Sequence, residues 1–183
     1  MLLVRRSLER PVYKEKLRIR SYGSVSPDGK VFVELKKKCG DVVYKRRVSM
    51  PEQEAVRYLA GETEAPKPTQ IVSELDYFRS RYRDLAPAAY IACDRQAFFG
   101  KDDPSFRATF DENIRWRDTD RSLCADTRGE QLLPPGQSLM ELKLSDAMPL
   151  WFARELSRQD VFRVNFSKYG SAYKAEREKA LAA

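Results

Sequence analysis

Lys16-Leu17-Arg18-Ile19-Arg20 carries the clearest β-strand pattern in this chain. Successive side chains of a β-strand point to opposite faces, so this stretch puts three cations on one face and Leu17 and Ile19 on the other. Six strand-like segments of the chain carry Lys and Arg at alternate positions in this way. An ordinary exposed sheet face mixes charges of both signs, so repeated cationic faces indicate a sheet curled around a polyanion.

The residues that follow predict an antiparallel meander and then two helices. Turn-type sequences at 26–29 and 39–41 separate three predicted strands, 16–22, 31–37 and 42–48. Ser49 is the predicted N-cap of the next helix, with Glu52 completing a capping box and Gly61 ending the helix. Ile71, Leu75, Phe78 and Tyr82 then follow at helical spacing.

The second half of the chain predicts more strands and a helix before the C-terminus. The expected elements are strands 89–99, 106–117 and 139–144, a loop 118–137, a helix 146–158, an extended segment 161–169 and a helix 172–183. Strict alternation in 106–117 puts Arg107, Thr109, Asp111, Asn113, Arg115 and Arg117 on one face. Turn-length links between strands favour an α+β fold built on an antiparallel sheet or barrel.

Composition narrows the classes of partner and of chemistry. The net charge of +7 and pI of about 9.3 favour an anionic partner such as nucleic acid, polyphosphate, nucleotide or lipid, although many basic proteins have no such partner. With no histidine, Ser-His-Asp and Cys-His catalysis are excluded. Three dispersed cysteines without a CxxC pair fit a reducing cytoplasm, and no apolar run is long enough for a membrane span or a signal peptide.

Alternating cations supply a candidate anion-binding set. Its members are Lys16, Arg18, Arg20, Lys36, Lys45, Arg47, Arg107, Arg115, Lys143 and Lys168. Each alone also fits a solvated surface cation, and the pattern does not decide whether they face solvent or a cavity. Glu141, two residues before Lys143, suits either a Mg²⁺ or Mn²⁺ ligand or a simple ion pair. No glycine-rich phosphate loop is present, and the aromatic residues form no compact RNA-binding signature.

Several of these segments occur together, in the same order, in one known family. The segments are Lys16-Leu-Arg-Ile-Arg-Ser-Tyr-Gly, Val33-Glu-Leu-Lys36, Tyr44-Lys-Arg-Arg, Tyr90 through Arg95-Gln-Ala-Phe, Arg107-Ala-Thr-Phe-Asp, Met140-Glu-Leu-Lys143 and Phe166-Ser-Lys-Tyr-Gly. Over residues 1–171 the chain resembles the VTC (vacuolar transporter chaperone) domain of polyphosphate polymerases, in the triphosphate tunnel metalloenzyme superfamily. We expect residues 172–183 to form a helical tail.

The resemblance implies an antiparallel β-barrel tunnel with flanking helices, and transfer of the γ-phosphate of ATP to a growing polyphosphate chain with Mn²⁺ or Mg²⁺. By motif, nine residues would hold the phosphates of ATP and of polyphosphate, namely Arg18, Arg20, Lys36, Lys45, Arg95, Arg107, Lys143, Ser167 and Lys168. Glu141 would hold the metal. Strict alternation places Arg95 with Ile91, Cys93 and Ala97, so a bulge near Asp94 is expected if Arg95 faces the tunnel. No residue is assigned to proton transfer, since positioning and charge neutralisation suffice.

Family members carry two further strands before the point that corresponds to residue 1. We therefore expect one of three situations: the chain is a fragment, its start is assigned too late, or the barrel is open and thus incomplete at this side. Asn165 also stands where the family tends to place a basic residue. Two other functions fit the same residues, a tunnel triphosphatase that releases phosphate and a module that binds polyanions without turnover. A sequence-specific nucleic-acid partner is not expected.

Overall fold

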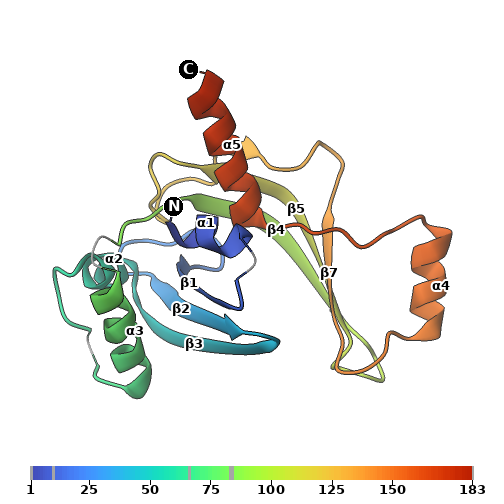
Figure 1. The fold of residues 1–183 in the computed structure, drawn as a ribbon, viewed down its shortest axis with the longest axis horizontal. Coiled ribbons are helices and arrows are strands. Elements are labelled where there is room, and N and C mark those ends of the chain that lie inside the picture. Colours follow the sequence, from blue (N-terminus) through green and yellow to red (C-terminus); the bar gives the residue numbers. More distant parts are fainter. Residues whose placement is uncertain (1, 10, 66, 83–84, 183) are drawn as a thin grey trace.

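In the computed structural model, the described residues form two antiparallel sheets and five helices (Figure 1). The structure describes residues 2–9, 11–65, 67–82 and 85–182. The predicted α+β class with antiparallel sheets is confirmed. Over the described residues the two sheets are separate and do not close into a barrel, as expected for the incomplete form.

The first sheet is the predicted meander, with strand order β1-β2-β3. Its strands are β1 (Tyr13–Arg20), β2 (Lys30–Cys39) and β3 (Val42–Pro51), longer than the alternating cores that predicted them. One face of this sheet is apolar and packs on α2 (Glu52–Ala60) and α3 (Gln70–Arg81). The buried core lies in this contact and includes Val33, Leu35, Tyr58, Leu75 and Phe78. The helices therefore leave the other face of the sheet free for polar side chains.

The start of α2 differs from the prediction. Ser49 is not an N-cap, because it lies within β3 and pairs with Phe32. The first backbone N–H groups of the helix instead bond to the turn between β1 and β2. Glu52 N donates to Gly29 O at 2.9 Å and Gln53 N donates to Pro27 O at 3.0 Å. These carbonyls satisfy donors that a capping side chain would otherwise satisfy.

The second sheet contains β4 (Tyr90–Phe99), β5 (Arg107–Arg117), β6 (Glu130–Gln131) and β7 (Leu139–Lys143). β5 pairs with all three other strands, and the short β6 lies in the predicted loop. The β4–β5 register does shift between Ala92 and Asp94, as expected of a bulge near Asp94, but β4 itself keeps strict alternation, so Arg95 stays on the same face as Cys93. The extra residue belongs to β5, where Asn113 adopts a left-handed φ of 48°.

This bulge corrects the prediction that Arg107 to Arg117 present one continuous face. Before the bulge, Asp111 pairs with Arg95, and after it Arg115 pairs with Ala92. The one-residue shift moves Arg115 and Arg117 to the face opposite Asp111. Arg117 is buried there, with its guanidinium 3.6 Å from the centre of the Tyr90 ring.

Three further helices complete the structure. α1 (Leu2–Leu8) was not predicted, and it contacts β1 and α5 (Lys168–Ala182). α4 (Leu150–Arg158) begins after Pro149 rather than at 146, because proline is preferred at or just before the first turn. Residues 161–167 pair with no strand, and α5 starts earlier than predicted. Among the described residues, no helix has the length and apolar character needed to cross a membrane.

Candidate anion-binding site

The free face of the first sheet is strongly cationic. Alternation and the observed register put nine cations on it, namely Lys14, Lys16, Arg18, Arg20, Lys30, Lys36, Lys38, Lys45 and Arg47. Within β1 to β3, Glu34 is the one acid on this face. The strand register arranges these residues in rows that run across all three strands. Cations that are far apart in the sequence therefore lie side by side on one surface.

Glu34 lies at the centre of one row, between Arg18 and Arg47. It is 2% exposed, and it accepts from Arg18 Nε at 2.6 Å, Arg47 Nε at 2.7 Å and Lys45 Nζ at 2.9 Å. Burial alone would raise the pKa of Glu34, but these hydrogen bonds outweigh burial and lower its pKa to about 2. The carboxylate is therefore ionised at neutral pH and holds its three partners in place.

The neighbouring row contains only ammonium groups. Lys16 pairs with Lys36, and Lys36 pairs with Lys45, so three lysines stand side by side across the sheet. Burial lowers the pKa of Lys16, and repulsion from Lys14, Lys36 and Arg18 lowers it further. Like charges on directly opposed strand positions are destabilising. A multivalent anion would relieve this repulsion.

The second sheet presents a smaller polar face. Arg95 pairs with Asp111, Thr109 pairs with Glu141, and Arg107 pairs with Lys143. Buried Asp111 accepts from Arg95 Nε at 2.5 Å and also from Lys168 Nζ. Burial would raise the pKa of Asp111, but Arg95 and Lys168 together lower it. As on the first sheet, a buried carboxylate holds cations in position.

The start of α5 links the two polar faces. Lys168 reaches Asp111 of the second sheet, while Tyr169 lies beside Arg18 of the first sheet. Burial would lower the pKa of the Arg18 guanidinium, but Tyr169 and Glu34 together raise it. Lys16 Nζ is 6.0 Å from the centre of the Tyr169 ring. Figure 1 shows the base of α5 between the sheets. Two adjacent residues thus bring the cations of both sheets to one region.

Arg107, Lys143 and Glu141 lie at the outer end of the second face. The Arg107 guanidinium is 4.9 Å from the centre of the Phe99 ring, and its Nε is buried without a hydrogen-bond partner among the described residues. Arg115 Nε, on the opposite face, shares this property. Glu141 is half exposed and 3.5 Å from Lys143, so the ion pair considered from the sequence does form.

The structure thus groups the predicted residues by sheet. Arg18, Arg20, Lys36 and Lys45 share the first face, and Arg95, Arg107, Glu141 and Lys143 share the second. Lys168 joins the second face. The Ser167 hydroxyl accepts from Gly170 N at 3.2 Å, which is the bond expected of an N-cap. Sequence reasoning assigned no role to Asp111 or Tyr169, since only the register and the position of α5 bring them to the cations.

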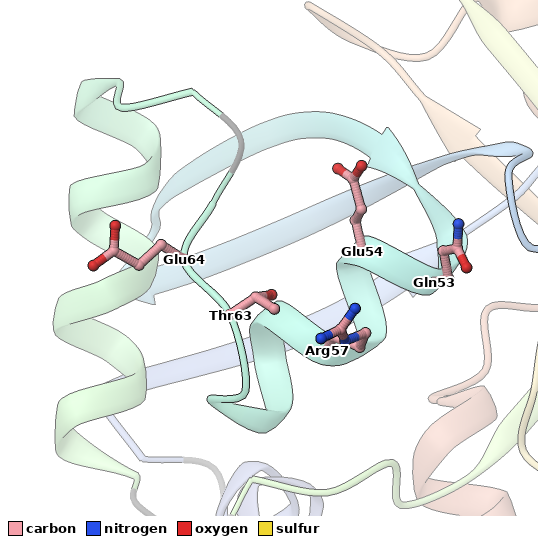
Figure 2. Close-up of a pocket in the computed structure, with 5 residues that line it drawn as sticks. All are labelled: Gln53, Glu54, Arg57, Thr63 and Glu64. Atoms are coloured by element: carbon pink, nitrogen blue, oxygen red, sulfur yellow. The ribbon is translucent and has the colours of Figure 1, made fainter.

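A shallow hollow lies outside this site. It is lined by Gln53, Glu54, Arg57, Thr63 and Glu64, on α2 and the connector that follows it (Figure 2). Since α2 covers the apolar face of the first sheet, this hollow lies on the other side of that sheet from the cations. Its lining mixes two acids with one arginine, so it has no character of a phosphate site.

The fold and the site define an α+β domain in which two antiparallel sheets each present cations held by a buried carboxylate. A family model, the VTC domain, matches residues 1–176, and the chain belongs to that family. Membership associates the chain with polyphosphate polymerases and phosphate chemistry of the tunnel type, which generally uses divalent metals. A search of curated proteins finds no matching sequence.

Proposed function

We propose that this domain binds nucleoside triphosphate and polyphosphate on its cationic faces, and that it transfers the γ-phosphate of ATP to a growing polyphosphate chain. The observation that carries the proposal is the row Lys16–Lys36–Lys45. Three ammonium groups stand in register there, and the nearest acid, Glu34, is already surrounded by cations. Lys45 reaches Glu34, but among the described residues Lys16 and Lys36 form no ion pair with an acid, so an external anion would neutralise them.

The chemistry of the cations supports phosphate as that anion. Guanidinium groups bind phosphate oxygens through two parallel hydrogen bonds, and ammonium groups act as point charges. Arg18, Arg20 and Arg95 would supply the first kind of contact, and Lys36, Lys45, Lys143 and Lys168 the second. The buried, unpartnered Nε of Arg107 is a donor whose desolvation an acceptor oxygen would offset. The Ser167 hydroxyl would contribute while capping α5.

Glu141 is the proposed contact for Mn²⁺ or Mg²⁺. Such ions prefer oxygen ligands, and Mg²⁺ is commonly held by one or two carboxylates together with substrate phosphates. In the described part of the chain, no three acidic or cysteine side chains gather into a metal-binding group. The Glu141 side chain is 50% exposed and not enclosed by cations as Glu34 is, so it fits a site completed by phosphate oxygens. The metal would neutralise charge on the transferred phosphoryl group.

Binding and turnover are tested separately. Lys36→Ala combined with Lys45→Ala should weaken tripolyphosphate binding about 10- to 30-fold, because each exposed charge contributes about 1 kcal/mol at close range. Lys67→Ala combined with Lys174→Ala removes the same charge elsewhere and should change little. Equal effects of the two pairs in calorimetric titration would contradict the proposed site.

Turnover is measured by incubating the protein with ATP and Mn²⁺ and separating phosphate from polyphosphate. Polyphosphate that disappears in Glu141→Gln supports the polymerase. Phosphate release without chain growth identifies a tunnel triphosphatase instead. Binding without turnover identifies a polyanion-binding module, the candidate favoured by the two sheets remaining separate.

A further inference from the structure

Two aromatic rings lie at one end of the first cationic face. Phe32 pairs with Arg20, in the row next to Arg18–Glu34–Arg47, and Tyr22 lies two residues after the end of β1. The rings of Tyr22 and Phe32 meet edge to face, with centres 5.8 Å apart and planes at 75°. This is a favoured arrangement of aromatic pairs, so Phe32 fixes the orientation of Tyr22.

The two rings differ in how much of their surface a ligand could contact. Phe32 is half buried and already contacted by cations, with the Arg47 guanidinium at 4.4 Å and Lys30 Nζ at 5.6 Å from its centre. Tyr22 is 65% exposed, although Arg20 lies 4.8 Å from its ring centre and Arg47 Nη2 donates to its hydroxyl at 3.4 Å. The Arg20 guanidinium thus lies over the Tyr22 ring and Arg47 holds its hydroxyl, while most of the side chain remains exposed to a ligand.

We propose that Tyr22, supported by Arg20, is a stacking platform for the base of a nucleoside triphosphate. The inference rests on the proposed function and specifies one end of that ligand. Rows on a strand are about 7 Å apart, because each residue advances the chain by about 3.4 Å. A base on Tyr22 therefore lies close to phosphates held by Arg18 and Arg47, and the lysine row continues along the same face.

Stacking also determines which ligands the platform distinguishes. Every base has a π face, so an aromatic ring binds bases with little preference for their hydrogen-bonding edges. Adenine and guanine nucleotides should therefore bind alike. Inorganic tripolyphosphate has no base, so its affinity should not depend on the Tyr22 ring. A ring that only restrained Arg47 would instead affect both kinds of ligand equally.

The experiment measures binding of ATP, GTP and tripolyphosphate to the full chain by calorimetry. Tyr22→Ala should weaken ATP and GTP about 5- to 150-fold, the range that corresponds to about 1–3 kcal/mol for stacking of one base. Tripolyphosphate affinity should stay within about twofold. Tyr22→Phe keeps the ring without the hydroxyl and should bind ATP as wild type does. Tyr77→Ala is the matched control, since Tyr77 is 63% exposed and lies on α3.

Three results would overturn the inference. ATP affinity unchanged in Tyr22→Ala excludes stacking, and an equal loss for ATP and tripolyphosphate assigns the ring to positioning of cations. Failure of wild type to bind either ligand refutes the proposed function itself, which separates the two failures. Circular dichroism establishes that each variant is folded. If Tyr22→Ala does not fold, Tyr22→Leu replaces it in the comparison, because leucine keeps apolar bulk without a π face.

Discussion

Replacing Glu34 by glutamine should destabilise the protein through the loss of charge, since the two side chains have nearly the same shape. The pKa of Glu34 falls from 4.5 to about 2 in the folded protein. At 1.36 kcal/mol per pKa unit, this shift corresponds to about 3 kcal/mol of stability at neutral pH. The three cations around the carboxylate are 34–44% exposed, so solvent screens part of the interaction. We expect Glu34→Gln to lose about 1–3 kcal/mol.

The loss should depend on pH in a defined direction. A carboxylate whose pKa is lowered by folding stabilises the protein above its unfolded pKa and loses that effect as pH falls toward the folded value. The difference between wild type and Glu34→Gln should therefore be full above pH 4.5 and disappear as pH approaches about 2. Urea denaturation at pH 7, 5, 4 and 3 measures it, with unchanged m-values confirming comparable unfolding transitions.

Glu62→Gln provides the control. Glu62 is also paired with an arginine, Arg57, at 3.5 Å, but its side chain is 61% exposed, so we expect a change within about 0.5 kcal/mol. Equal stability of wild type and Glu34→Gln at pH 7 would mean that the ionised Glu34 carboxylate does not stabilise the folded protein. A stability difference that persisted unchanged to pH 3 would show that glutamine acts through packing rather than through loss of charge.

Three other predictions concern different parts of the molecule. Asp111→Asn should accelerate hydrogen exchange at the start of α5 about tenfold or more, because Lys168 loses its buried partner. Arg117→Lys should make loop 118–129 more sensitive to protease, since Arg117 donates to four backbone carbonyls there. Polyphosphate binding at alkaline pH should take up protons, because a bound anion raises the lowered pKa of Lys16, and calorimetry in buffers of different ionisation enthalpy measures this uptake.

Each of these has an outcome that contradicts it. Exchange in α5 that is the same in Asp111→Asn and wild type would mean that Lys168 does not anchor the helix. Arg121→Lys changes an exposed arginine of the same loop. An equal increase in protease sensitivity in this variant would mean that the hydrogen bonds of Arg117 do not hold the loop. Binding enthalpies that do not vary with the buffer would mean that Lys16 keeps its proton with and without polyphosphate.

Much of the fold follows from local patterns in the sequence. Alternation of charge with Leu17 and Ile19 identified β1, and helical spacing from Ile71 identified α3, because side-chain periodicity reports directly on one buried face. Ser49 was misassigned because its capping pattern is local, whereas the actual cap comes from Pro27 and Gly29, far away in sequence. Arg95 led to the expectation of a bulge near Asp94, but the extra residue lies in β5, and nothing in the sequence near Asn113 marks it.

The site was less predictable than the strands that carry it. Alternation shows that Lys36 has a cationic neighbour along its strand, but only the register shows that Lys16 and Lys45 stand beside it. The anchoring role of Asp111 depends on Lys168, fifty-seven residues away, and no local pattern encodes a pair of that separation. Residues that bind an anion and residues that orient them look alike in sequence, so their roles separate only in three dimensions.

Because Lys168 and Tyr169 are adjacent, the contacts that α5 makes with the two sheets depend on the directions in which these two side chains leave the helix. Each residue of an α-helix advances the side-chain direction by about 100°, because there are 3.6 residues per turn. One residue inserted between them would rotate Tyr169 away from Arg18 if Lys168 kept its bond to Asp111. Substitutions at exposed positions such as Lys174 and Arg177 are expected to be tolerated, but the first turn of α5 can accept neither insertion nor deletion. The first turn of α5 thus fixes the distance between the two cationic faces.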